Sequence, residues 1–243
     1  MFTLVKKEIN GFLNSRIGYI VIVVFLLVIG LFLWVFPVEF NILDFGYASI
    51  DGLFVLAPFV FLFLIPAITM RSFAEEKKSG TLELLMTQPL TDLQVILAKF
   101  MAGVVLVLFA LVPTLIYYVS IYILGLPTGN IDSGAFWGSF IGLILLGACF
   151  VSIGIFASAL SDNQIVSFII AVFLSFLLYM GFELIYSFVL SGEIGLLIQS
   201  LGISAHYSSI SRGVVDTRDL VYFFSVMGLF VLLSKLVLES RKW

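Results

Sequence analysis

The chain has 243 residues, of which 62% are hydrophobic and 11% are charged, and its mean hydropathy is +1.22. Soluble domains carry roughly 45–50% apolar and about 25% charged residues, so this composition excludes a water-soluble globular protein and predicts that lipid surrounds most of the chain. A net charge of −3 does not indicate a nucleic-acid partner, and one cysteine, Cys149, with one histidine, His206, is too few for a disulfide framework or a zinc site.

Residues 1–16 form the first predicted element, an interfacial helix ahead of the first membrane span. Its apolar side chains recur at helical spacing: Phe2, Val5, Ile9, Phe12 and Leu13. This face is expected to lie along the lipid surface, with the nearby lysines beside anionic headgroups. An elbow at Gly11 or Gly18 would lead into the span. A short cytosolic tail is the alternative.

Six stretches are long and apolar enough to cross a membrane, because a hydrocarbon core about 30 Å thick needs roughly 20 helical residues. They cover approximately 17–37, 52–69, 95–124, 134–160, 165–190 and 220–238. The first lacks a signal-peptide cleavage site and is predicted to be retained. The third is too long for an upright helix, so either it is kinked at Pro113 or it emerges into water at its Tyr117–Tyr122 end. The predicted fold class is an all-α polytopic membrane protein with one domain over 1–243.

Small residues in the fourth span predict close helix packing there, namely Gly142, Gly147, Ser152 and Gly154.

The basic residues predict the orientation of the whole chain. Of the 12 lysines and arginines, only Arg212 and Arg218 fall on one side of the predicted spans, and the others, Arg241 and Lys242 included, fall on the opposite side. The positive-inside rule then places both termini in the cytoplasm.

The loop 71–92, between the second and third spans, is too long for a simple connection, which needs about 2–8 residues. Gly80 is expected to end one helix, a short helix should follow from Thr81, and Pro89 should stop it. Thr91 and Gln94 have capping-box spacing for the third span. A helix that faces the cytoplasm between such breakers favours a docking role. A solvated turn is the alternative.

The next cytoplasmic connection, 161–164, is predicted to be a tight turn in which Ser161 or Asp162 caps the fifth span. Glu183 is the one acidic residue well inside a predicted span. Because a carboxylate in lipid is costly, it is a candidate for function, although snorkelling or a broken helix near the outer surface is an equal explanation.

The last outward segment, 191–219, contains apolar residues at helical spacing from Ile194 to Leu201, which predicts a short or re-entrant helix. Arg212 and Arg218 lie beside Asp216 and Asp219. Local pairing of these charges is expected to fix the entry into the sixth span, and ligand contact is the alternative.

Several enzyme classes lack their residues. No stretch matches the phosphate-binding pattern Gly-x-x-x-x-Gly-Lys-Ser/Thr, so the chain is not predicted to hydrolyse ATP alone. Glu75 and Glu76 resemble the paired glutamates of intramembrane prenyl-protein proteases, but the arginine of that pattern is Gly80 here. A serine protease is disfavoured because His206 has no evident serine partner within a span.

The chain resembles the permease of a type 2 ATP-binding-cassette (ABC) transporter in three features: six spans, an N-terminal interfacial helix and the sequence of residues 73–89. The Glu-x-x-x-Gly-Thr-x-Glu pattern with a proline six residues later is similar to that family's loop between spans two and three. Its residues here are Glu76, Gly80, Thr81, Glu83 and Pro89. Within the family, residues 208–220 most resemble the gliding-motility-associated permeases, and permeases for copper-enzyme maturation share much of this text.

The resemblance implies a half-channel in a bacterial cytoplasmic (inner) membrane that pairs with a second permease copy or a paralogue. Two cytoplasmic ABC ATPase subunits would bind ATP and Mg, and this chain would bind no cofactor. The helix from Thr81 would be the coupling helix, with Glu75, Glu76 and Glu83 against the ATPase. The segment 192–203 would be the outer gate, and Glu183, Arg212, Asp216 and Arg218 would be path or gate candidates. A non-transporting scaffold and an ion channel are the remaining alternatives.

Overall fold

The computed structural model describes residues 1–46, 48–188 and 193–240, and all regular secondary structure within these ranges is helical. Six segments are long and apolar enough to span a membrane. They are α2 (Arg16–Trp34), α4 (Asp51–Thr69), α7 with α8 (Asp92–Leu111, Leu115–Leu124), α9 (Ser133–Leu160), α10 with α11 (Gln164–Phe176, Phe182–Phe188) and α14 (Thr217–Glu239). The predicted all-α polytopic fold class is confirmed. Residue 190, the predicted end of the fifth span, lies outside the described residues, as do Arg241 and Lys242.

Two spans are interrupted. A 3₁₀ turn, Val112–Thr114, separates α7 from α8 and contains Pro113, which cannot donate a helical hydrogen bond. The regular α-helix is therefore interrupted at Pro113, the residue where the kink was expected. In the fifth span a π-helical turn, Leu177–Gly181, joins α10 to α11. Such turns insert one extra residue into a helix and often occur at functional sites. The sequence pattern did not predict it.

The N-terminal elbow lies at a different place from the predicted glycines. Helix α1 (Phe2–Leu13) ends before Asn14, and Ser15 caps α2 by accepting a hydrogen bond from the Gly18 N–H at 3.0 Å. The elbow is thus at residues 14–15, because a serine N-cap stabilises the new helix. Gly18 serves the close approach instead, since an added Cβ would lie 2.3 Å from the Phe12 carbonyl oxygen.

Helix α9 is the centre of the bundle and packs against α4, α7, α10 and α14. The small residues predicted to allow this do so. An added Cβ would lie 2.0 Å from Thr69 Oγ1 at Gly154, and 2.8 Å from a Val107 methyl at Gly147. Helices can approach this closely only where side chains are absent, and dispersion contacts then hold them together in lipid.

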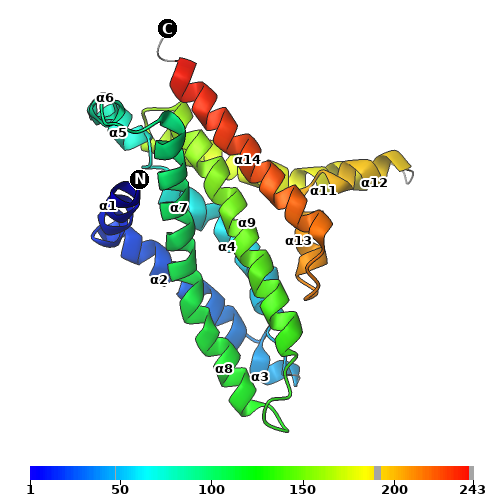
Figure 1. Ribbon diagram of the computed structural model, residues 1–243. Coiled ribbons are helices and arrows are strands. Elements are labelled where there is room, and N and C mark those ends of the chain that lie inside the picture. Colours follow the sequence, from blue (N-terminus) through cyan, green and yellow to red (C-terminus); the bar gives the residue numbers. More distant parts are fainter. Residues whose placement is uncertain (47, 189–192, 241–243) are drawn as a thin grey trace.

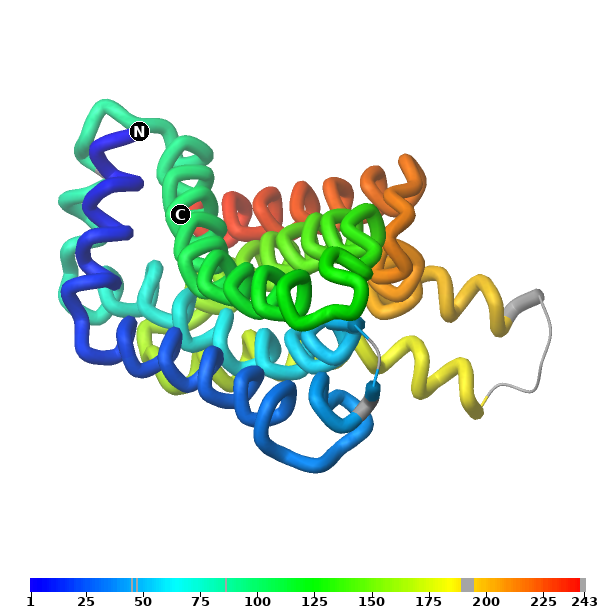
Figure 2. Tube along the Cα trace, turned by 90° about the horizontal axis from the view of Figure 1, so that it is seen from below, coloured from blue at the N-terminus to red at the C-terminus, as the bar shows by residue number. Residues whose placement is uncertain are grey.

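The two ends of the bundle carry different elements (Figure 1). One end, here called the α1 side, holds α1, α5 (Ala74–Lys78), α6 (Thr81–Met86), the turn 161–163 and the last residues of α14. The opposite end, the α3 side, holds α3 (Ile42–Phe45) and the loop 125–132. Helices α11 and α12 (Glu193–Ser200) lie side by side and project from the bundle (Figure 2). Helix α13 (Ile203–Ile210) returns against α9 and α14.

Candidate functional site

The loop between the second and third spans contains two short helices. α5 ends before Ser79, and Gly80 has a φ of +70° ahead of α6. Glycine tolerates a positive φ without steric cost, so it reverses the chain between the two helices. Thr91 and Gln94 form a capping box at the start of α7, each bonding the other's backbone N–H. The predicted break, short helix and capping box are confirmed.

Most residues predicted to couple to an ATPase lie on the exposed surface of this loop. They are Glu75, Gly80, Thr81, Glu83 and Pro89. Leu84 is 67% exposed beside them, whereas Leu82 is 7% exposed and belongs to the hydrophobic core. Leu85 is partly buried and also packs against this core, so Leu82 and Leu85 fix helix α6, which presents an acidic and apolar outward face.

Ser158 ties the start of α5 to the end of α9. Its hydroxyl oxygen accepts hydrogen bonds from the buried N–H groups of Phe73, at 2.9 Å, and Ala74, at 3.1 Å. The same hydroxyl donates to the Met70 carbonyl oxygen at 3.1 Å. Lys77 donates to the Ala159 carbonyl oxygen. Because buried N–H groups need partners, this contact fixes the loop to the central helix.

Lys99 is a second anchor, and it joins three elements. Its side chain is 1% exposed, and its ammonium donates to Glu8 Oε1 of α1, at 2.9 Å, and to the Ser72 carbonyl oxygen, at 2.6 Å. It also forms an ion pair with Glu76 Oε2 of α5 at 3.0 Å and lies 5.0 Å from the Phe73 ring centroid. Buried charges persist when they are paired in this way. The ammonium therefore links α7 to both α1 and the loop.

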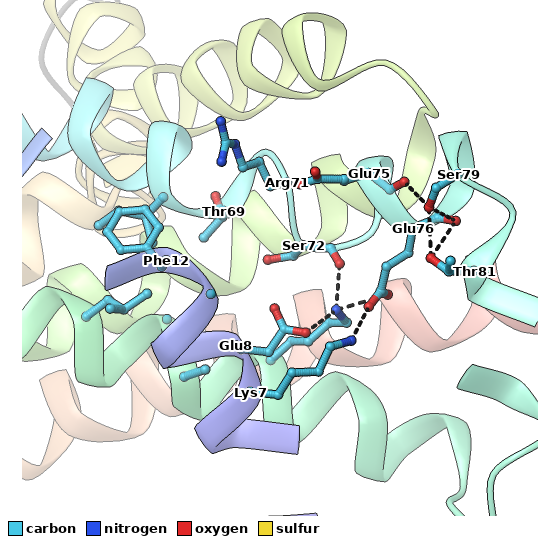
Figure 3. Close-up of a pocket in the computed structure, with 16 residues that line it drawn as sticks. Lys7, Glu8, Phe12, Thr69, Arg71, Ser72, Glu75, Glu76, Ser79 and Thr81 are labelled. Atoms are coloured by element: carbon cyan, nitrogen blue, oxygen red, sulfur yellow. Dashed lines mark hydrogen bonds and ion pairs between the residues drawn. The ribbon is translucent and has the colours of Figure 1, made fainter. Parts of the chain in front are cut away.

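Glu76 differs from the other predicted coupling residues in its surroundings. Its side chain is 13% exposed, and Lys7 is a second cation 3.7 Å from its Oε1. Figure 3 shows the side chains of Lys7, Glu8 and Glu76 converging at the edge of a polar cavity of about 420 Å³ between α1, the loop and α7. The two lysines and two glutamates have no net charge together. Glu76 therefore joins the loop to α1 and α7.

Sequence reasoning missed Lys99 and Glu8 as a pair. Lys99 was counted only among the basic residues that predict the orientation, and no role was predicted for Glu8. The available signal was a lysine flanked by Ala98 and Phe100 in an apolar helix, since ionisable residues in spans require partners. Its partner could not be named because Glu8 is 91 residues away in sequence.

The turn between α9 and α10 is short, as predicted, but its cap differs. Asn163 caps α10, because its Oδ1 accepts from the Ile165 N–H at 2.9 Å. Ser161 accepts from the Asn163 N–H instead, at 3.0 Å. The predicted caps, Ser161 and Asp162, were wrong because they lie two residues and one residue, respectively, before the observed N-cap Asn163.

Two helices, rather than one, occupy the segment before the sixth span. α12 matches the predicted re-entrant helix, whose expected start at Gly192 lies outside the described residues, and α13 was not predicted. His206 of α13 holds the end of α12. Its Nε2 donates to the Ser200 carbonyl oxygen at 2.9 Å, and its Nδ1 lies 2.7 Å from Asp219 Oδ1 of α14. Carbonyl and carboxylate oxygens only accept hydrogen bonds, so Nε2 is the donor to Ser200, and Nδ1 is the donor to Asp219 when that carboxylate is ionised.

Tyrosines complete this attachment. Tyr222 of α14 stacks on the His206 ring at 3.8 Å between centroids and donates to the Leu201 carbonyl oxygen at 2.7 Å. Tyr207 of α13 donates to the Phe54 carbonyl oxygen of α4 at 2.7 Å. The last carbonyls of a helix lack intrahelical partners, so His206 of α13 and Tyr222 of α14 supply partners at the end of α12.

The predicted pairing of Arg212 and Arg218 with the neighbouring aspartates was wrong for the described residues, in which neither arginine forms an ion pair. Asp219 is 6% exposed and turns toward His206. Asp216 caps α14 instead, accepting from the Arg218 backbone N–H at 2.9 Å. Both arginines remain exposed. A capping aspartate uses its carboxylate on backbone N–H groups, which leaves the arginines to solvent or headgroups.

Glu183 lies in the first turn of α11, immediately after the π-helical turn. Its Oε2 accepts from Ser204 Oγ of α13 at 3.0 Å. The helix continues through the π-helical turn into α11, so the broken helix that was one explanation for this carboxylate is not seen between Gln164 and Phe188. Glu183 lies far from the loop 71–92, so the candidate residues form two separate groups, one on each side of the bundle centre. Across the described ranges, no three His, Cys, Asp or Glu residues are grouped as metal ligands.

These features define a multi-pass α-helical membrane protein with an anchored loop on one side and a helix pair toward the other. The family model described as "ABC-2 family transporter protein" matches residues 41–201, more than half of the chain. The chain belongs to this family and is a membrane permease of an ABC transporter, a class that normally partners with cytoplasmic ABC ATPase subunits. No curated protein matches it. The matched range includes the loop and Glu183 but stops before residues 208–220.

Proposed function

We propose that this chain forms half of a transport path and couples it to ATP hydrolysis by separate cytoplasmic ABC ATPase subunits, with α6 as the coupling helix. The observation that carries the proposal is the combination of an exposed acidic and apolar face on α6 with two buried anchors beneath it. A loop that served only as a connection would need neither. ATP and Mg belong to the partner subunits.

The anchors give the coupling a physical route. A displacement of α6 moves α5, because Gly80 joins them directly. Ser158 transfers that movement to the end of α9, and Lys99 transfers it to α7 and α1. Since α9 packs on four other spans, a small tilt at its end is spread through the bundle. In this account Glu75 and Glu83 contact the ATPase, and Glu76 holds the loop to the membrane-embedded part.

The orientation and assembly complete the proposal. Both termini lie in the cytoplasm of a bacterial cell whose inner membrane holds the protein, so α1 rests on the inner leaflet. A second copy or a paralogue supplies the other half of the path. Helices α12 and α13 gate the outer side, and Glu183, Arg212, Asp216 and Arg218 line the path or gate.

The text of residues 208–220 supports an exporter linked to gliding motility. A permease for copper-enzyme maturation is the second candidate, because it shares much of the same text.

Affinity purification of the tagged chain from its own mild-detergent-solubilised membranes tests the coupling. Glu83→Arg reverses the charge on α6, and Asp162→Arg makes the same change at an exposed position on the same side of the bundle. We expect an ABC ATPase subunit to co-purify with wild type and Asp162→Arg and to be lost with Glu83→Arg. Equal recovery from both variants would contradict the assignment of α6, and a chain that purifies alone would favour a scaffold or channel.

A further inference from the structure

A small cavity lies beside Glu183, toward the α3 side of the bundle. It has a volume of about 230 Å³ and is enclosed by α4, the π-helical turn, α11, α12 and α13. No part of the ATPase-coupling account uses it. The cavity, here called the Glu183 pocket, is lined by one carboxylate, four aromatic rings and several neutral hydroxyls.

The aromatic wall of the Glu183 pocket is built from α4, the π-helical turn and α13. Tyr179 and Tyr207 are 7% and 4% exposed, and their ring centroids lie 6.4 Å apart. Phe59 meets Tyr179 edge-on, with a centroid distance of 6.2 Å and an interplanar angle of 88°. The Tyr207 hydroxyl is occupied by the Phe54 carbonyl oxygen, whereas the Tyr179 hydroxyl has no hydrogen-bond partner among the described residues. This wall is aromatic and carries one hydroxyl, that of Tyr179, without a hydrogen-bond partner among the described residues.

The carboxylate of Glu183 is the one formal charge in the lining of the pocket. Its Oε2 accepts from Ser204, and within the described ranges no lysine, arginine or histidine lies within ion-pair distance of it. An uncompensated carboxylate in a membrane span is unfavourable, and the span that carries Glu183 runs from Gln164 to Phe188. Glu183, which is an exposed residue, therefore presents an unpaired negative charge to the pocket.

An organic ammonium group fits these features. A positive charge is attracted both to a carboxylate and to the faces of aromatic rings within about 6 Å. The neutral oxygens of Gln199, Ser204 and Ser208 offer acceptors for N–H donors. The negative charge of Glu183 would repel anions. The volume of the Glu183 pocket is below the roughly 300–1,000 Å³ of pockets for drug-sized ligands. Size and charge together select a small cationic group.

We propose that the Glu183 pocket binds the ammonium group of an organic amine, with Glu183 as counter-ion and Tyr179 and Tyr207 as aromatic walls. The inference deepens the proposed function, on which it rests in taking the pocket as part of the transport path. The amine is either a free solute or the headgroup of a membrane lipid. Tyr179 of the π-helical turn and Glu183 of α11 are four residues apart, and both line the pocket.

The test is binding of defined probes to the purified full chain in nanodiscs. Choline and ethanolamine are titrated calorimetrically into phosphatidylglycerol nanodiscs, and 3,3-dimethyl-1-butanol serves as the uncharged counterpart of choline. A second arm compares retention of phosphatidylethanolamine and phosphatidylglycerol by native mass spectrometry. We expect saturable binding of at least one ammonium probe and none of the neutral alcohol. Retention of phosphatidylethanolamine without binding of free amines would assign the ligand to lipid.

The variants separate the charge from the fold. Glu183→Gln is expected to weaken ammonium binding by about tenfold or more, and Tyr179→Leu by about threefold, whereas Tyr179→Phe keeps the ring and most of the affinity. Glu39→Gln removes an exposed carboxylate outside the pocket and should bind as wild type does. Absence of binding of both free amines together with no preference for phosphatidylethanolamine, equal affinity for the neutral alcohol, or unchanged ligand binding in Glu183→Gln would overturn the inference. ATPase co-purification is measured on the same variants, so that its persistence shows that only the pocket assignment has failed.

Discussion

Replacement of Lys99 by methionine should destabilise the α1 side of the protein more than any surface charge does. The substitution keeps the length of the side chain and removes the ammonium that pairs with Glu8 and Glu76. Breaking a buried pair by removing one partner costs about 3–5 kcal/mol. Here Glu8 and Glu76 keep 23% and 13% exposure, and Lys7 remains 3.7 Å from Glu76. We therefore expect a loss of about 2–4 kcal/mol, after allowance for this residual solvation and pairing.

Thermal unfolding in detergent, followed by tryptophan fluorescence, measures this loss. For a chain of this length the expected fall in Tm is roughly 5–15 °C. Lys235→Met is the matched control, because Lys235 pairs with Glu239 at 3.5 Å with both side chains well exposed. An exposed i,i+4 pair contributes only about 0.3–0.5 kcal/mol.

A double-mutant cycle with Glu76→Gln isolates the contact itself. If Lys99 stabilises the fold through Glu76, its replacement costs less in the Glu76→Gln background, with a coupling of about 1–2 kcal/mol. A Lys99→Met protein that melts like Lys235→Met would refute the reasoning. Full additivity in the cycle would show that Lys99 acts without Glu76.

Three further predictions concern the other contacts. Ser158→Ala leaves the buried N–H groups of Phe73 and Ala74 without their acceptor, so it should lower the unfolding free energy by about 1–3 kcal/mol. Deuterium uptake should rise in residues 73–86, and unchanged uptake would contradict the anchor. Gly154→Ala places a Cβ against Thr69 and should lower the free energy of chemical unfolding by about 1–3 kcal/mol. Gly228→Ala, with open space around it, should not lower this free energy, and equal effects of the two variants would refute the packing argument. Asp219→Ala removes the partner of His206 Nδ1, so hydrogen exchange should quicken in residues 193–210 and stay slow in α9; uniform exchange would disprove the attachment.

The sequence predicted the spans well because their signals are local. An apolar helix of about 20 residues has few other places to lie, and Pro113, Gly80 and the Thr91–Gln94 box act within one turn of the chain. The elbow was predicted at Gly11 or Gly18, because glycine can break a helix, but it lies at Ser15. Gly18 instead allows the close approach of a backbone carbonyl. Local breaker residues indicate where a helix is weak, and the cap decides where it starts.

The contacts that give the candidate sites their form are nonlocal. Lys99 meets Glu8 across 91 residues of sequence, and Ser158 meets Phe73 across 85. The sequence analysis predicted that Asp219 pairs with the arginines near it in the chain. In the structure Asp219 faces His206, because α13 packs on α14. No periodicity or spacing specifies which span lies beside which, so the exposed loop was predictable and the anchors beneath it were not.

Site-specific photocrosslinking from α6 tests the central claim most directly. A benzoylphenylalanine at Leu84, which is 67% exposed on the proposed ATPase-binding face, is activated in native membranes, and crosslinked peptides are identified by mass spectrometry. The same probe at Leu126, which is 91% exposed in the loop on the α3 side, is the control. The account predicts a crosslink from Leu84 to a subunit that contains a nucleotide-binding phosphate loop, and none from Leu126. A probe at Leu84 that reaches no such subunit, or a crosslink to it from Leu126, would contradict the coupling role of α6.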